Sequence, residues 1–161
     1  MEIQEFIELW AGLWFAQRTS YQLNEQTIDN SKAELTVVSL ETDHPEVVQL
    51  CQQYQVEPSL SQGGIKVSWD NKIDWGKSQQ VGSNSLVFLK TGEFLHPSFR
   101  GDYSLGSDEA LTLSVVSQDL SSNERIYFAS ANLKLRTVLT EYPDGSNETA
   151  FYTEIRKITT S

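Results

Sequence analysis

Apolar residues recur at every second position along most of this chain, and this period of two constrains the fold more than any other feature. Such alternation places successive side chains on opposite faces of an extended strand. Turn residues such as Gly63-Gly64, Thr91-Gly92 and Pro143-Asp144-Gly145 separate the alternating segments. Strands are predicted over residues 33–40, 65–69, 86–89, 111–116, 126–129, 133–139 and 151–158, with an earlier extended run beginning at Trp14. The pattern therefore predicts an all-β protein.

Two segments depart from this period and are predicted to be short helices. At the start of the chain, apolar residues follow the spacing of one helix face, at Ile3, Phe6, Ile7 and Trp10. A second helical spacing runs from His44 to Tyr54 and interrupts the series of strands.

Residues 1–161 are predicted to form one domain, because no proline-rich linker, low-complexity tract or internal repeat divides them. Many short strands joined by tight turns are typical of a sandwich or an antiparallel barrel, and a barrel leaves no sheet edge exposed. Gly12-Leu13-Trp14 also resembles the entry into the first strand of lipocalin-like barrels, where the Trp closes the floor beside an Arg from a late strand. That resemblance implies a lipocalin-like up-and-down barrel of 8–10 strands, with an N-terminal helix and one helical insertion. Barrels of this size enclose a cup for one small ligand.

Charge and composition narrow the classes of function. The net charge is −10 and the pI is about 4.6, which disfavours binding to nucleic acid. One cysteine and two histidines make a disulfide within the chain or a His/Cys metal site unexpected. No apolar run approaches the length of about 18 residues that a membrane span needs. The acidic start lacks the cationic segment of a secretory signal, so a cytoplasmic location is expected.

Two tryptophans and two cations are candidates for binding a flat, anionic ligand. Trp69 and Trp75 flank a predicted hairpin turn and offer indole faces to a conjugated molecule, although core packing is the alternative. Alternation over residues 132–137 places Lys134 and Arg136 on one strand face and leucines on the other. The two cations can clamp paired carboxylates, or they can form a solvated face above a leucine core.

Two carboxylates on late strands are candidates for acid or hydrogen-bonding roles. Glu124 shares a strand face with Ile126 and Phe128. If this face points inward, Glu124 is a buried acid with a raised pKa that can donate a proton or hold N–H groups; at a strand entrance it is solvated instead. Glu154 poses the same choice, with Arg156 as a candidate for a structural ion pair.

Arg18 and Cys51 complete the set of residues considered for chemistry. Arg18 is an isolated cation in an acidic first third of the chain, and inside a fold it needs an anionic partner, either Glu154, another carboxylate or a ligand. Cys51 lies on an apolar face of the second predicted helix, without a neighbouring cation or His to lower its pKa. We therefore interpret Cys51 as a packing residue.

From end to end, the chain resembles the S/U-type phycobiliprotein lyases, which are lipocalin-like proteins that attach linear tetrapyrroles (bilins) to phycobiliproteins. Several long segments carry this resemblance in the family's order. They are EFIELWAGLWFAQRTSYQL, HPEVVQLCQQYQVEPSLSQGGIKVSW, LGSDEALTL, ERIYFASANLKLRTV and FYTEIRKI.

The resemblance implies a function for the chain. It would bind phycocyanobilin or phycoerythrobilin as a substrate rather than as a permanent cofactor. It would guide a cysteine thiol of an apo-phycobiliprotein subunit to the ethylidene group of ring A, mainly by orienting the bilin. By position, the resemblance implies catalytic roles for Glu124 and Arg136 and no metal. It implies bilin-binding roles for Arg18, Tyr21, Trp69, Trp75, Lys134 and Glu154.

Two departures from the family pattern point to one of its branches. Tyr21 stands where the family has a His after R-T-x, and Lys134-Leu135-Arg136 replaces R-x-R. Tyr does not exchange protons near neutral pH as His does, and Lys lacks the bidentate fork of Arg. Both departures fit the U-type branch, whose members act as one half of a heterodimer with an S-type lyase.

Several interpretations therefore remain open from the sequence. A lyase subunit paired with an S-type partner or with a second copy is favoured, in the cyanobacterial cytosol or a plastid stroma. The alternatives are a non-catalytic bilin carrier or chaperone, and a structural partner whose cup is filled by its own side chains.

Overall fold

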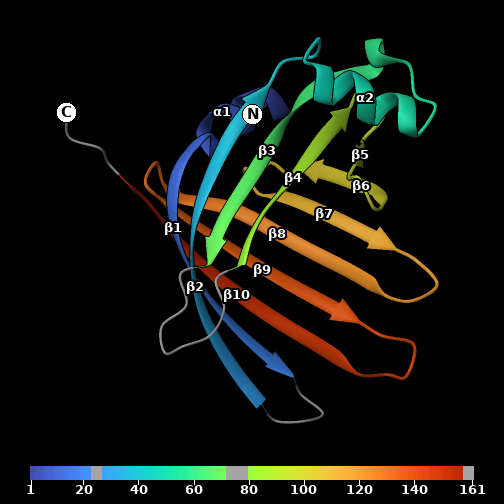
Figure 1. Ribbon diagram of the computed structural model, residues 1–161. Coiled ribbons are helices and arrows are strands. Elements are labelled where there is room, and N and C mark those ends of the chain that lie inside the picture. The colour runs from blue at the N-terminus through green and yellow to red at the C-terminus, as the bar shows by residue number, and fades with distance from the viewer. Residues whose placement is uncertain (23–26, 72–79, 158–161) are drawn as a thin grey trace.

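Ten strands, each antiparallel to the next along the chain, close into a barrel in the computed structural model, which describes residues 1–22, 27–71 and 80–157 (Figure 1). The first and last strands pair with each other and complete the closure. The strands are β1 (Gly12–Gln22), β2 (Thr27–Leu40), β3 (Ser61–Asn71), β4 (Gln80–Leu89), β5 (Glu93–Leu95), β6 (Arg100–Leu105), β7 (Leu111–Val116), β8 (Ser121–Ser130), β9 (Leu133–Glu141) and β10 (Asn147–Arg156). The helices are α1 (Ile3–Trp10), α2 (Pro45–Gln53) and the short 3-10 helix η1 (Pro58–Leu60).

The alternation of side chains defines the inside of the barrel. On β1, Trp14 and Ala16 are buried, whereas the intervening Phe15 is 49% exposed. The strand register continues the inner face around the barrel, because Trp14 lies opposite Leu35 of β2 and Leu35 lies opposite Trp69 of β3. Side chains on this face either pack in the core or line the interior.

Helix α1 contributes an apolar face to the core at one end of the barrel. The four residues predicted to share that face, Ile3, Phe6, Ile7 and Trp10, are all buried. The ring of Phe6 lies 5.2 Å from that of Phe128 on β8, in an edge-on arrangement. The predicted amphipathic helix is therefore confirmed.

Helix α2 covers a second, smaller core on the outer side of the barrel. This core combines residues of α2 with outward-facing residues of the neighbouring strands: Leu40, Val47, Leu50, Cys51, Val87, Leu89 and Leu95. Strand β4 is apolar on both faces near its end, because Phe88 belongs to the inner core while Val87 packs in the outer one. Cys51 is fully buried, and burial raises the pKa of its thiol, which agrees with the packing interpretation.

The predicted fold class, an all-β antiparallel barrel with two helices, is confirmed. Strands β5 and β6 were not predicted, because β5 has only three residues and β6 is largely polar. Strand β10 begins at Asn147, four residues before the predicted start, and the predicted end at Ile158 lies outside the described residues. Within the described ranges, no helix is long and apolar enough to cross a membrane.

Arg156 of the last strand connects that strand to the end of α1 at the floor of the barrel. Its guanidinium donates hydrogen bonds to the carbonyl oxygens of Leu9 (2.6 Å) and Ala11 (2.8 Å), and it lies 4.3 Å from the ring centroid of Trp14. A side chain at Gly12 would meet this guanidinium, since an added Cβ would lie 2.5 Å from Nη1, and the φ of +141° also favours glycine. The arrangement agrees with the Trp and late-strand Arg implied by the lipocalin-like resemblance. The ion pair between Arg156 and Glu154 that was considered from the sequence does not form, because the guanidinium of Arg156 donates its hydrogen bonds to backbone carbonyls instead.

Replacing Arg156 by Ala is expected to lower the free energy of unfolding by about 2–4 kcal/mol, because backbone carbonyls lose charge-assisted donors. Urea denaturation followed by tryptophan fluorescence measures the loss. The control is Arg125→Ala, which removes an exposed side chain paired with Asp108 on the surface and is expected to leave the midpoint unchanged. Equal midpoints for wild type and Arg156→Ala would contradict this role.

Candidate ligand-binding site

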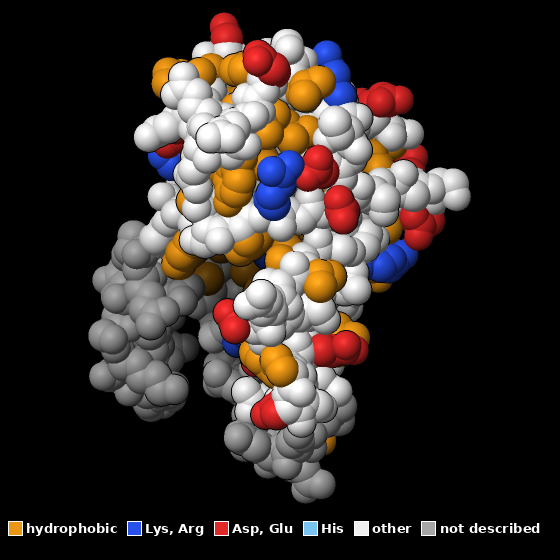
Figure 2. Space-filling view, turned by 90° about the vertical axis from the view of Figure 1, so that its right-hand side faces the viewer, with side chains coloured by type: hydrophobic (Ala, Val, Ile, Leu, Met, Phe, Trp, Pro, Cys, Tyr) orange, Lys and Arg blue, Asp and Glu red, His pale blue; other side chains and the backbone are white. Residues whose placement is uncertain are grey.

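The barrel encloses a cavity of about 920 Å³, which is within the range of sites for small molecules and cofactors. In the space-filling view of Figure 2, hydrophobic side chains are visible in the depth of a hollow. The lining combines aromatic and charged residues from most of the strands. Among the described residues it includes Trp10, Arg18, Trp69, Phe94, His96, Glu124, Arg136, Glu148 and Tyr152.

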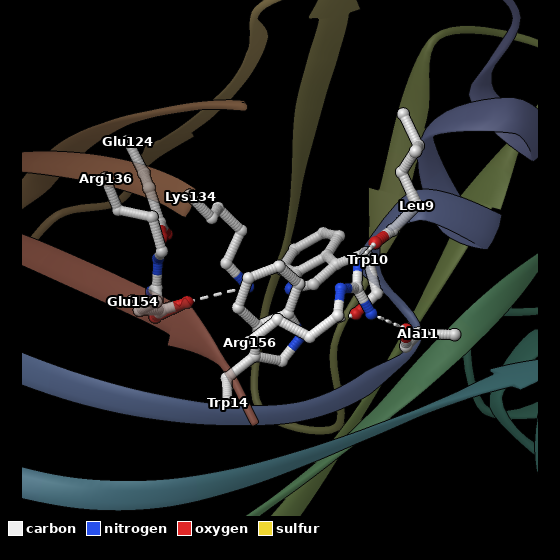
Figure 3. Close-up of polar contacts among 9 residues, drawn as sticks. All are labelled: Leu9, Trp10, Ala11, Trp14, Glu124, Lys134, Arg136, Glu154 and Arg156. Atoms are coloured by element: carbon white, nitrogen blue, oxygen red, sulfur yellow. Dashed lines mark hydrogen bonds and ion pairs between the residues drawn. The ribbon is translucent and has the colours of Figure 1, made fainter. Parts of the chain in front are cut away.

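Arg136 of β9 is held between two carboxylates on the wall of this cavity. Its Nε donates to Oε1 of Glu124 on β8 at 2.7 Å, and its Nη1 donates to Oε1 of Glu154 on β10 at 2.9 Å. The guanidinium also lies 4.4 Å from the ring centroid of Tyr152. Because neighbouring strands supply all three partners, the barrel register fixes the direction of the guanidinium. Figure 3 shows Arg136 with its two carboxylate partners, Glu124 and Glu154.

Lys134 lies deeper than Arg136, on the same face of β9. Its side chain is fully buried, and its Nζ lies 2.7 Å from Oε2 of Glu154 in an ion pair. The contact is close but not aligned as a hydrogen bond. The ammonium also lies 4.9 Å from the ring centroid of Trp10 and 4.6 Å from that of Trp14 (Figure 3). An anion and two indole faces therefore compensate for the water that the cation has lost.

Burial and mutual attraction act in opposite directions on these charges. Burial is the largest influence on Lys134 and lowers its pKa to about 8, although Glu154 favours the charged form. For Glu154, burial favours the neutral acid, but Arg136 and Lys134 outweigh it and lower the pKa. Burial also opposes the charge of Arg136, and its two carboxylate partners nevertheless raise its pKa. Glu154 is thus an ionised structural link, and the raised pKa considered for it from the sequence is wrong.

Arg18 of β1 provides a second cation on the cavity wall. Its Nη2 donates to Oε1 of Glu148 at 3.0 Å, and its Nε donates to the hydroxyl of Tyr152, also at 3.0 Å. Tyr152 therefore stands between the two arginines, with its hydroxyl bound to Arg18 and its ring facing Arg136. The predicted anionic partner of Arg18 is Glu148 rather than Glu154.

Trp69 supplies the aromatic wall that the sequence suggested, and it lines the cavity from β3. Gly82 on β4 lies opposite Trp69, and a Cβ added there would be 2.4 Å from the indole ring. Glycine at this position therefore leaves room for the indole. Trp75 lies outside the described residues.

The remaining predicted residues are not all brought to the cavity. Lys134 and Glu154 are buried beneath it, so the solvated alternative for Lys134 is wrong. Tyr21 is absent from the described lining, and alternation from Arg18 along β1 places it on the outer face. In contrast, Glu124 and Arg136 meet at the wall, as expected for inward-facing strand positions.

Sequence reasoning missed Glu148, Tyr152 and His96. Glu148 and Tyr152 share the inner face of β10 with Glu154. Tyr152 lies within the predicted strand, two residues before Glu154, and a strand predicted to begin earlier would have added Glu148 to this face. His96 follows the unpredicted strand β5, and its ring stacks on that of Phe99 with centroids 4.0 Å apart. Burial lowers the pKa of His96. Within the described ranges, no group of three or more His, Cys, Asp or Glu side chains could hold a metal ion.

Replacing Lys134 by Met is expected to flatten the pH dependence of stability between pH 8 and 10.5. The pKa of Lys134 is about 8 in the fold, against an ordinary value of 10.5. Between these values the unfolded chain binds more protons. Lys134 therefore makes the free energy of unfolding rise with pH, by no more than about 3 kcal/mol in total.

Urea denaturation across this pH window measures the difference between wild type and Lys134→Met. The matched control is Lys90→Met, which removes an exposed lysine and is expected to keep the wild-type slope. Parallel curves for wild type and Lys134→Met would contradict the burial of a titrating ammonium.

Comparisons with known proteins place these features in a family. The sequence profile of the family described as CpeS-like protein matches residues 2–157. A protein of Thermosynechococcus vestitus named chromophore lyase CpcS/CpeS is 37% identical, over 97% of this chain and 93% of its own length. Chromophore lyase CpcS/CpeS 1 of Synechocystis is 35% identical, over 98% of this chain and 92% of its own.

A solved structure supports the fold. The S-type phycobiliprotein lyase CPES from Guillardia theta superposes with a TM-score of 0.90 at 24% identity, covering 99% of this chain and 95% of that one. None of these three names refers to the U-type branch, so that finer assignment stays a prediction. The match over nearly the whole length shows that this chain belongs to the CpeS-like protein family.

Proposed function

We propose that this chain is a phycobiliprotein lyase or lyase subunit, which binds a bilin in the barrel cavity and promotes its attachment to a cysteine of a phycobiliprotein subunit. One observation carries the proposal: Arg136 lines an open cavity, and Glu124 and Glu154 hold its guanidinium in a fixed direction. The names of the relatives, chromophore lyase and phycobiliprotein lyase, support the same activity.

The chemistry of the cavity suits an open-chain tetrapyrrole. A bilin has a conjugated face, pyrrole N–H donors and two propionates. The indole of Trp69 offers a stacking surface, Glu124 offers a carboxylate to N–H groups, and the cavity volume suits one such molecule. Arg18 and Arg136 are the lining cations that would receive the propionates.

The fixed groups act by orientation. Because Glu154 and Lys134 hold the far side of Arg136, its guanidinium does not have to be ordered when the ligand arrives. A bilin held by its propionates and N–H groups presents ring A in one direction, which favours one site of attachment. Glu124 and Arg136 are thus the proposed catalytic pair, while Lys134 and Glu154 are positioning residues.

The nucleophile comes from the acceptor protein. Cys51 is the single cysteine of this chain, and it is buried in the outer core, away from the cavity lining. In the transfer itself, the acceptor thiol adds across the ethylidene double bond of ring A. One C–S bond and one C–H bond replace the S–H bond and the π bond, so no oxidant or reductant is consumed.

The open cavity counts against a purely structural subunit whose interior is filled by its own side chains. A non-catalytic bilin carrier would use the same binding groups and is distinguished by the absence of a thioether product. The bilin's identity, the acceptor subunit, an S-type partner or second copy, and the cytosolic or stromal location belong to this proposal as predictions from the resemblance.

Mixing the protein with phycocyanobilin and an apo-phycobiliprotein subunit is expected to give a covalent, fluorescent product. The reaction is run with and without an S-type partner, and the adduct is measured by mass and by fluorescence after denaturation. Bilin binding with no thioether in either reaction would favour the carrier, whereas a yield independent of this chain would overturn the proposal.

Replacing Arg136 by Lys is expected to weaken phycocyanobilin binding about tenfold and to lower the adduct yield, because Lys keeps the charge but loses the fork that binds two carboxylates and a ligand. Absorption titration measures the Kd. Arg125→Lys, outside the cavity lining, is the matched control and is expected to bind as wild type does. Wild-type affinity and yield for Arg136→Lys would remove this residue from the site.

Replacing Cys51 by Ala is expected to leave the adduct yield unchanged while lowering the free energy of unfolding by about 1 kcal/mol, because a packed sulfur is lost far from the cavity. Yield is measured well below the unfolding temperature of the variant. Loss of transfer in a fully folded Cys51→Ala protein would indicate a covalent bilin intermediate on this chain.

A further inference from the structure

The cations of the cavity are already neutralised before any ligand arrives. Among the described residues that line it, the guanidinium groups are Arg18 and Arg136, and the carboxylates are Asp119, Glu124 and Glu148. Lys134 and Glu154 lie beneath the lining and cancel each other. A ligand with two carboxylates therefore enters a cavity whose described wall offers it no net positive charge, and it has to replace an internal partner of an arginine.

The two arginines differ in how firmly their partners are held. Arg136 has two carboxylates, and one of them, Glu154, is fully buried and tied to Lys134. Arg18 has one carboxylate partner among the described residues, Glu148, whose side chain is 22% exposed. Water reaches both members of the Arg18–Glu148 pair, since the Arg18 side chain is 31% exposed, and it also reaches Arg136 and Glu124, which are 19% and 20% exposed. What distinguishes Arg136 is its second partner, the fully buried Glu154, which holds the guanidinium in place.

The surroundings of Glu148 allow it to leave without disordering the site. It is the second residue of β10, beside the turn from β9, and among the described residues its other oxygen makes a single, long contact of 3.5 Å, with Nε2 of Gln22. When Glu148 leaves, Arg18 keeps its hydrogen bond to the Tyr152 hydroxyl and remains directed at the cavity.

We propose that Glu148 is an internal counter-ion that pairs with Arg18 until a carboxylate of the ligand displaces it. This inference rests on the proposed function, because it takes the ligand to be a bilin diacid. Glu148 then lowers the affinity for the free pigment, and it makes the Arg18 subsite selective for ligands whose carboxylate replaces its own. It also offers Arg18 a partner again when the product departs.

The test compares phycocyanobilin with its dimethyl ester, which has the same conjugated system and no carboxylates. Both are titrated by absorption into the full chain and into Glu148→Gln. The diacid is expected to bind Glu148→Gln about 2–5-fold more tightly than wild type, the range that corresponds to losing a partly solvated ion pair. The Kd of the ester is expected to stay unchanged.

Two further variants separate exchange at Arg18 from a general effect of charge. Asp108→Asn changes the net charge by the same amount as Glu148→Gln, but at an exposed position outside the described lining, and it is expected to bind the diacid as wild type does. In an Arg18→Met background, Glu148→Gln is expected to have no effect on diacid binding, because the cation over which the carboxylates compete is gone.

The outcomes are distinct. Unchanged or weaker diacid binding by folded Glu148→Gln, an equal gain for the ester, or a gain that persists in the Arg18→Met background overturns the inference and leaves the proposed function intact. A wild-type chain that binds neither pigment overturns the proposed function, and this inference with it.

Discussion

A line of alternating charges inside the barrel, Lys134, Glu154, Arg136 and Glu124, is the interaction on which the site depends. Buried charges are costly unless each has an opposite charge nearby, and here each one does. The line begins beneath two indoles at the floor and ends at the cavity wall. It exists only because β8, β9 and β10 are neighbours in a register that brings their inward positions together.

The same inner face serves as core at one end and as site at the other. Near α1 it is filled by aromatic and aliphatic side chains, and Arg156 binds this end of the barrel to carbonyls at the C-terminal end of the helix. Farther along, the side chains become polar and leave a cavity. A packed floor holds the charged wall rigid, which suits a protein proposed to act by orienting a pigment for a thiol that another protein supplies.

The sequence predicted much of the fold, and less of the site. Alternation correctly placed Lys134 and Arg136 on one face, because a period of two belongs to the strand itself. It could not say that Lys134 is fully buried while Arg136 remains partly exposed at the cavity, since depth along a barrel depends on what closes its end. Strand β5 was too short and β6 too polar to be recognised, and the late predicted start of β10 concealed Glu148.

What the sequence determined by itself is local: the strand period, the two helices, the turn positions and the family motifs. Which carboxylate meets which cation was decided only by the tertiary structure. Arg18 lies far from Glu148 along the chain and meets it because the first strand pairs with the last. Barrel closure sets that pairing through hydrogen bonds and the register of every intervening strand, and no stretch of sequence carries this information alone.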